Sequence, residues 1–254
     1  MARRGVGAAE RKRVRSAKAM KLTIVGSGDA FGSGGRTNTC FFLETAKAKL
    51  LIDCGASALP ALKGQVIPLN EIDGVVLSHL HGDRFLSKRD KPLLIAGPPG
   101  TRERLTAAME VFFPKSSGSK WNFDWRVEEI AVGVETGVLG HTLVTAEVIH
   151  QSGAPSTALR LSDGETTFAY SGDTEWTDAL LPIVRGADLF ICECYAHAGK
   201  LTGHMSWEIL KQRLGDLGAK RTMITHMNPT MLAKTDEAKA AGVLVAADGL
   251  TLEF

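Results

Sequence analysis

Two histidines and an aspartate follow one apolar run. Residues 75–77 lead into His79, His81 and Asp83, which alternate along the chain. In an extended segment, alternate side chains point to the same side, so all three can converge on one point. Imidazole and carboxylate are ligands that zinc accepts. Taken alone, the segment fits either a metal site or three polar residues in a solvated loop.

Three more polar residues stand in the same kind of position. They are His150, Asp173 and His226, each directly after a stretch that is typical of a strand. In layered α/β proteins, ligand sites gather where strands end, so residues that are distant in sequence can meet there. This repetition favours a metal site over a solvated loop.

The order of these residues resembles the five motifs of the metallo-β-lactamase superfamily. The matching positions are Asp53 in Leu-Leu-Ile-Asp-Cys-Gly, the segment His79-Leu-His-Gly-Asp83, His150, Asp173 in Ser-Gly-Asp-Thr, and His226. The likeness runs from about residue 20 to the C-terminus. The opening Gly-Ser-Gly-Asp-Ala-Phe at 26–31, the Asp-Cys-Gly and the pair Glu193 and His204 are most similar to the ribonuclease Z group of phosphodiesterases.

This resemblance implies a fold and a site. The fold would be a four-layer αββα sandwich of residues 20–254, with the site at one edge between two sheets. The implied ligands of one or two Zn²⁺ ions, or of Mn²⁺, are His79, His81, Asp83, His150, Asp173 and His226. The implied catalytic residues are Asp83, His204 and Glu193, the last holding His204 so that it contacts the phosphate or protonates the leaving oxygen. Asp53 would support the site by hydrogen bonds.

Arg84 departs from the pattern of the family, in which a second histidine stands beside the motif aspartate. Arginine offers only donors and stays protonated, so it cannot ligate a cation. The following loop is also short. The second metal position then depends on Asp83, Asp173 and His226.

Three functions therefore stay open. The first is a phosphodiesterase that acts on RNA 3′ ends or on a smaller phosphodiester. The second is a degenerate, non-catalytic member of the family with an impaired second metal site. The third is a hydrolase of lactone, thioester or β-lactam substrates, which a single-metal site could serve. His204 could alternatively be a plain loop or helix-capping residue, and Asp53 could simply satisfy its own turn.

Composition narrows the setting. With 44% hydrophobic and 23% charged residues in a chain of 254, we expect one globular domain. No apolar stretch approaches the roughly 18 residues that span a bilayer, so no membrane association is expected. Four cysteines are too few for a disulfide framework, which favours the cytoplasm. Cys192 and Cys194 are expected to be core thiols, and the resemblance implies a homodimer.

Charge is unevenly distributed. Eight of the 30 basic residues, but only one of the 28 acidic residues, lie within residues 1–21, so the remainder is net acidic by about five charges. Residues 1–19 are interpreted as a basic, disordered extension, with nucleic-acid or anionic-membrane binding as the alternative. An acidic body disfavours long polyanions and makes a small phosphodiester as plausible as tRNA.

Local patterns predict the remaining elements. Apolar periodicity predicts helices over 101–113, 175–185 and 206–217, and aromatic alternation predicts a strand over 121–125. The glycine-rich stretch 26–35 is interpreted as an anion-contacting loop or a surface turn. His141 precedes a strand and has no matching motif, so it is predicted to lie on the surface.

Overall fold

The computed structural model describes residues 19–79, 90–112, 114–120, 122–152 and 155–254, without the side chain of Phe112. His81, Asp83 and Arg84 lie outside the described residues, and so does nearly all of the basic extension. Among the helices described, none is long and apolar enough to cross a membrane.

The strands of the described residues form two seven-stranded sheets. In the first sheet the order is β14 (Thr251–Glu253), β1 (Lys21–Gly26), β2 (Cys40–Glu44), β3 (Lys49–Ile52), β4 (Gly74–Val76), β5 (Leu93–Gly97) and β6 (Trp125–Glu129). In the second the order is β13 (Leu244–Val245), β12 (Thr222–Thr225), β11 (Leu189–Glu193), β10 (Thr167–Tyr170), β9 (Thr157–Ser162), β8 (His141–Glu147) and β7 (Thr136–Val138). Both sheets mix parallel and antiparallel pairs.

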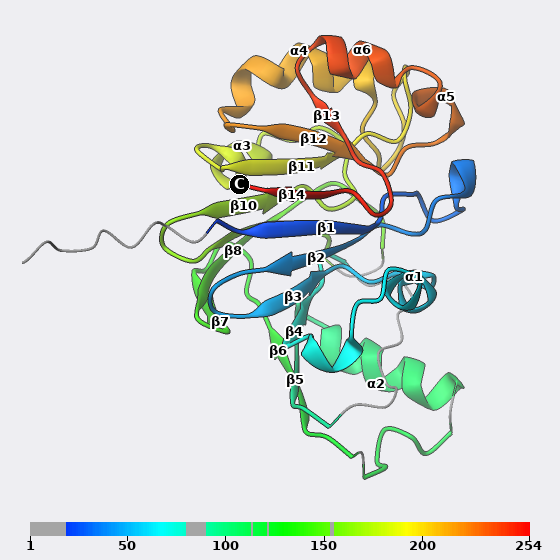
Figure 1. Ribbon diagram of the computed structural model, residues 1–254, viewed down its shortest axis with the longest axis vertical. Helices are drawn as coiled ribbons and strands as arrows, with labels where there is room; N and C mark the ends of the chain where they lie inside the picture. Colours follow the sequence, from blue (N-terminus) through cyan, green and yellow to red (C-terminus); the bar gives the residue numbers. More distant parts are fainter. Residues whose placement is uncertain (1–18, 80–89, 113, 121, 153–154) are drawn as a thin grey trace, which may run out of the picture.

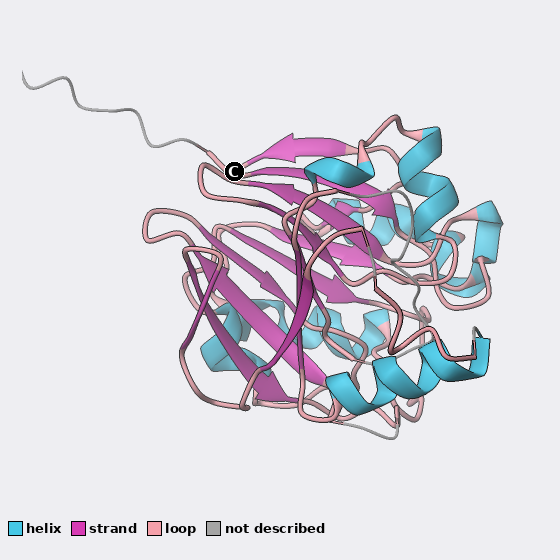
Figure 2. Cartoon of the chain, turned by 90° about the horizontal axis from the view of Figure 1, so that it is seen from below, coloured by secondary structure: helices cyan, strands magenta, loops and turns pink. Residues whose placement is uncertain are grey.

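Helices cover the outer faces of both sheets (Figures 1 and 2). Those on the first sheet are α1 (Ala58–Gly64) and α2 (Thr101–Phe112), and those on the second are α3 (Leu180–Val184), α4 (Trp207–Leu217), α5 (Pro229–Leu232) and α6 (Thr235–Ala240). Short 3₁₀ turns lie at η1 (Ser33–Gly35) and η2 (Leu69–Glu71).

The hydrophobic core explains the layering. One cluster lies between the sheets, where Phe41 of β2 contacts Phe168 and Tyr170 of β10 edge to face. A second cluster packs helices against the outer face of the second sheet, and a third packs α1 against the first. These strands bury side chains on both faces, which is why they read as nearly continuous apolar runs in the sequence. The chain is therefore an αββα sandwich, as predicted.

The topology brings one set of strand ends together. β3, β4 and β5 run parallel, and so do β10, β11 and β12. β8 and β10 both pair antiparallel with β9, so these two also point the same way. The carboxyl ends of parallel strands lie along one edge of a sheet, and that edge is where functional residues gather.

Three local predictions need correction. His141 is 2% exposed, not on the surface, because Thr45 and the Leu139 carbonyl oxygen both bond its ring. The helix predicted over 175–185 spans only Leu180–Val184, since Asp173 to Asp178 form the loop that bonds the site. The strand predicted over 121–125 begins only at Trp125 within the described residues.

Two other predictions are confirmed. The helix expected over 101–113 is present as Thr101–Phe112, and the one expected over 206–217 begins at Trp207. Cys192 and Cys194 are fully buried free thiols of the core, and burial raises the pKa of both.

Candidate metal centre and active site

His79 lies just beyond β4 and is oriented by the residue before it. The hydroxyl of Ser78 donates to Asp53 Oδ2 at 2.5 Å, and Ser78 N donates to Asp53 Oδ1 at 2.7 Å. The same Ser78 oxygen lies 2.8 Å from His79 Nδ1. Because that hydroxyl proton is already given to Asp53, Ser78 accepts from the His79 Nδ1–H. The ring then turns Nε2 toward the other strand ends.

Asp53 itself ends β3 in an unusual backbone conformation. Its φ is +52°, a left-handed value that non-glycine residues seldom adopt. Asp53 is only 6% exposed. Burial raises its pKa, while His79 and Ser78 oppose that rise. The observed geometry matches the supporting function that the resemblance implies for Asp53.

His150 follows β8 and is held by a backbone carbonyl. Its Nδ1–H donates to the Gly203 carbonyl oxygen at 2.9 Å. The Gly203 peptide N–H in turn donates to Glu175 Oε1 at 3.0 Å. Glu175 therefore fixes, through the backbone of Gly203, the loop that orients the imidazole. Burial lowers the pKa of His150, which favours the neutral ring that a metal requires.

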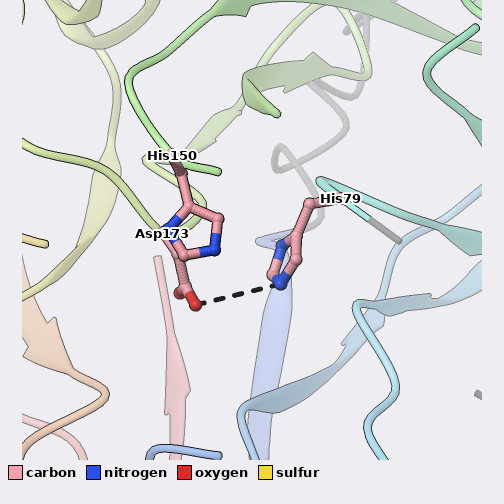
Figure 3. Close-up of side chains that lie close together, drawn as sticks. All are labelled: His79, His150 and Asp173. Carbon is pink, nitrogen blue, oxygen red and sulfur yellow. Dashed lines mark ion pairs between the residues drawn. The ribbon is translucent and has the colours of Figure 1, made fainter. Parts of the chain in front are cut away.

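Asp173, just past β10, is the point on which the histidines converge (Figure 3). Its Oδ2 lies 3.8 Å from His79 Nε2 and 3.4 Å from His226 Nε2. Its Oδ1 is buried and has no hydrogen-bond partner among the described residues. Burial alone would raise the pKa of Asp173, but His226 and His79 outweigh it and lower that pKa to about 2. Asp173 is therefore ionised at neutral pH.

His226 follows β12 and approaches Asp173 from the other side. Its φ is +60°, and its backbone N–H donates to the Ser27 carbonyl oxygen at 3.1 Å. Thr39 Oγ1 donates to the Gly28 carbonyl oxygen at 2.9 Å and lies 3.3 Å from His226 Nδ1. Thr39 therefore accepts from the His226 Nδ1–H, and Nε2 of the ring faces the Asp173 carboxylate.

His204 lies in the loop before α4 and pairs with Glu193 at the end of β11. Its Nδ1 is 3.1 Å from Glu193 Oε1 and 3.2 Å from Oε2. The ring stacks on His226 at 5.5 Å and on Tyr195 at 4.8 Å between centroids. Glu193 is fully buried, and burial raises its pKa well above the usual range. It also accepts from Thr174 N, which ties it to the Asp173 loop.

Two overlapping groups of residues have the spacing that a metal ion needs. They are His79, His150 and Asp173, and Asp173, His204 and His226; within each group, ligand atoms lie within 4.8 Å of one another. His79, His150 and His226 each give Nδ1–H to a protein acceptor, which leaves Nε2 of each ring for a metal ion. The Asp173 carboxylate adds a negative charge and a buried Oδ1 without a hydrogen-bond partner among the described residues. The donor set therefore fits a divalent metal.

A cavity of about 280 Å³ opens beside this centre. Its lining includes His79, Asp173, His226, Asp53 and Tyr170. The remaining lining comes from residues 28–30, 38–39 and 54–56, which belong to the loops after β1 and β3. A small substrate group can enter this cavity next to the metal ligands.

The structure brings together seven of the nine residues that the sequence singled out for the site, including Asp53. They are Asp53, His79, His150, Asp173, His204, His226 and Glu193, the last of which lies behind His204. The implied ligands His81 and Asp83 lie outside the described residues, so the full ligand set cannot be compared. In the described part of the chain, Asp173 joins His79 and His150.

Sequence reasoning missed Ser78, Thr39, Glu175 and Gly203. Ser78 and Glu175 are adjacent or nearly adjacent to motif residues, which is a weak signal for a supporting function. Thr39 lies 187 residues from its partner His226, and no local pattern marks that contact.

A histidine and aspartate centre at the strand ends of an αββα sandwich defines a metallo-hydrolase type of fold and site. The sequence model of the Beta-lactamase superfamily domain matches residues 48–227. The chain belongs to the metallo-β-lactamase superfamily.

Individual relatives agree with this assignment. The probable metallo-hydrolase YhfI of Bacillus subtilis is 27% identical over 230 residues, which cover 82% of this chain and 87% of that protein. Its crystal structure superposes with a TM-score of 0.75 at 23% identity, covering 93% of this chain and all of the other. A ribonuclease Z of Mycobacterium tuberculosis is 24% identical over 186 residues, 68% of each chain.

The structure of the short form of human tRNase Z has the same fold. It gives a TM-score of 0.71 at 20% identity, covering 91% of this chain and 98% of the other.

Proposed function

We propose that this protein is a zinc-dependent phosphodiesterase of the ribonuclease Z-like type. The observation that carries the proposal is His204, which is held by the buried Glu193 and faces Asp173 and His226. A carboxylate behind a histidine occurs at metal ligands as well as at general acids, because both functions need a fixed ring. We assign His204 to general acid catalysis because the ligand set that the motifs imply is complete without it. The relatives named as ribonuclease Z and tRNase Z add support.

Different residues of the chain would hold the metal, orient the imidazoles and donate a proton. His79, His150, Asp173 and His226, with His81 and Asp83 from the sequence motif, would hold one or two Zn²⁺ or Mn²⁺ ions. A bound zinc ion polarises the phosphoryl group and supplies an activated water at neutral pH. Ser78, Thr39 and the Gly203 carbonyl keep the imidazoles in the tautomer that ligation needs. His204 protonates the leaving oxygen, and Glu193 holds its opposite ring edge.

A small phosphodiester is favoured over a long RNA. The cavity of about 280 Å³ is at the lower end of ligand pockets, which span roughly 300–1,000 Å³. The chain after residue 21 is also net acidic, which opposes binding of a long polyanion. Activity on RNA 3′ ends stays within the proposal as the broader substrate class.

We also propose that the protein is a cytoplasmic homodimer. Cell fractionation would test its location, and light scattering would test its oligomeric state.

Turnover of a bis-aryl phosphodiester by zinc-equilibrated protein tests the proposal. We expect His204→Ala to lower kcat by about 10²- to 10⁴-fold, the contribution of a positioned general acid. The matched control is His197→Ala, because His197 is paired with Glu237 and belongs to neither metal group. Full activity of His204→Ala would remove this residue from the mechanism. Absence of any phosphodiester turnover in the wild-type protein would sink the proposal.

The presence of Arg84 favours one specific alternative. If arginine replaces a metal ligand, a single zinc ion could serve lactone, thioester or β-lactam hydrolysis instead. Elemental analysis after zinc equilibration separates these cases. About two equivalents per chain support phosphodiester chemistry, about one supports the single-metal hydrolase, and none supports a degenerate, non-catalytic member.

A further inference from the structure

The loop between β1 and β2 carries an aromatic side chain that the fold does not bury. Phe31 is 85% exposed, the largest exposed fraction among the large hydrophobic side chains described. Its neighbours Asp29 and Ala30 line the cavity beside the metal centre. In Figure 1 this loop, which contains η1, projects next to α5. Phe31 therefore directly follows two residues of the cavity wall and exposes its ring to solvent.

The base of this loop is fixed from both sides by one carboxylate. Asp248 accepts from Ser27 N at 2.9 Å and Ser27 Oγ at 2.6 Å. It also accepts from Thr37 N at 2.8 Å and Thr37 Oγ1 at 2.9 Å. Arg36 Nη1 adds bonds to Ser27 Oγ and to the Ala246 carbonyl oxygen. The loop is thus tied to the C-terminal part of the chain.

The tip is held equally well. The buried Asp29 carboxylate accepts from Phe31 N at 3.1 Å, Ser33 N at 3.0 Å and Ser33 Oγ at 2.7 Å. These bonds fix the backbone that bears the Phe31 ring. An exposed apolar side chain alone needs no explanation. One presented on a braced loop beside a reactive cavity is a preorganised contact surface, because little entropy is lost when it binds.

Small residues make up much of the described cavity wall on this side. Gly28, Ala30, Gly55 and Ala56 contribute no long side chain. Asn38 accepts from Ser57 and donates to the Asp29 carbonyl oxygen, and Thr39 is engaged by Gly28 and His226. Such a wall suits the flat face of a ring and leaves few groups to read its edge.

We propose that Phe31 and this wall form a subsite that stacks a nucleobase carried by the phosphodiester substrate. The subsite rests on the proposed phosphodiesterase function, since the phosphate would lie at the metal centre. Recognition by stacking tolerates different bases because every base has a π face. The substrate class is therefore a small nucleotide phosphodiester with little preference among bases.

Calorimetric binding to zinc-equilibrated protein tests the subsite without relying on turnover. The two probes are adenosine 5′-monophosphate and ribose 5-phosphate, which share the phosphate and sugar and differ in the base. We expect Phe31→Ala to weaken nucleotide binding by about 5- to 150-fold, the range for one stacked base. Binding of ribose 5-phosphate should change less than twofold.

Two variants sharpen the comparison. Phe31→Trp should keep nucleotide affinity, because a ring is retained. Val111→Ala, which shortens another exposed apolar side chain on α2, should change neither probe. The subsite is overturned if wild-type protein binds both probes equally, or if Phe31→Ala weakens both alike. Hydrolysis is measured separately: selective nucleotide binding without turnover counts against the proposed function alone, and turnover without selectivity counts against the subsite alone.

Discussion

At the scale of single residues, two glutamates with different surroundings support the histidines of the site. Glu193 is fully buried and bonds both Thr174 N and His204. Glu175 is partly exposed and bonds Gly203. Each glutamate acts through a neighbouring residue, so substituting it should have a different effect from removing a metal ligand. Glu193 should affect the His204 ring, whereas Glu175 should affect His150.

Glu193→Gln tests the first of these links. The amide keeps the size of the side chain but offers a donor to His204 as well as an acceptor, so the ring loses its fixed orientation. We expect kcat on a phosphodiester to fall about 10- to 100-fold, as for other residues that orient a reactive group. The zinc content should stay unchanged. Glu128→Gln, on β6 at the edge of the first sheet, is the control. A wild-type pH profile and kcat in Glu193→Gln would contradict the orientation argument.

At the scale of elements, loops rather than strands set the directions of the side chains. The loop 194–206 carries Gly203 at φ +78°, a left-handed conformation that suits glycine. A Cβ at this position would lie 3.1 Å from His150 Nδ1. Gly199 in the same loop has φ +91° and no atom within 4 Å of such a Cβ. An added Cβ would therefore meet an unfavourable φ at both positions, but only at Gly203 would it contact His150.

Gly203→Ala and Gly199→Ala form a matched pair. Both should lower the free energy of unfolding by about 1 kcal/mol, because alanine is strained at positive φ. Only Gly203→Ala should displace His150, and we expect zinc affinity to fall about 10- to 100-fold. Competition with a fluorescent chelator measures that affinity. Equal zinc affinities in the two variants would show that Gly203 does not position His150.

His141 at the start of β8 is an element-scale feature far from the metal centre. Its ring joins the turn after β2 to the turn before β8 through Thr45 and Leu139. Burial lowers the pKa of His141, so the unfolded chain binds a proton more readily than the folded one. The neutral ring contributes its stability above the unfolded pKa of about 6.5, and that contribution is lost as pH falls below this value.

His141→Gln removes this titration. We expect the wild-type Tm to fall more steeply between pH 7.5 and pH 5 than the Tm of the variant. The difference can reach about 1.4 kcal/mol for each unit by which the pKa values differ. Comparing the two pH values within each protein separates proton linkage from lost packing. Parallel pH profiles would show that His141 does not contribute to acid destabilisation.

At the scale of the whole molecule, the site joins the two sheets. Asp53 and His79 follow strands of the first sheet, whereas His150, Asp173 and His226 follow strands of the second. The Ser78 carbonyl oxygen also accepts from Thr157 N of β9 at 2.9 Å. A cation held by residues of both sheets should therefore stabilise the folded sandwich in addition to its function in the reaction.

Zinc removal should lower the Tm of the wild-type protein. At zinc concentrations about 100 times the Kd, bound metal adds about 2.7 kcal/mol, which corresponds to about 5–10 °C for a chain of this size. Thermal unfolding with and without a chelator measures the shift. His79→Ala should abolish most of the zinc-dependent shift in Tm, whereas His204→Ala should retain a larger part of that shift. Identical melting curves with zinc and with chelator would contradict a folded-state metal site.

Sequence alone determined the chemistry of the site and the class of fold. Residue types at strand ends gave His79, His150, Asp173 and His226, since apolar runs mark strands and the next polar residue marks an end. The order of these motifs then resembled one superfamily, and that resemblance implied the supporting function of Asp53. Residue types and the order of motifs are properties of the sequence, so they can be recognised without a three-dimensional structure.

Only the tertiary structure decided how these residues are held. Strand order placed Thr39 against His226 and the Gly203 carbonyl against His150, contacts that span 187 and 53 residues. It also buried His141, which lacks any apolar signal, because two turns close over its ring. Periodicity reports which face of one element is apolar, whereas these contacts depend on which loops the sheets bring together.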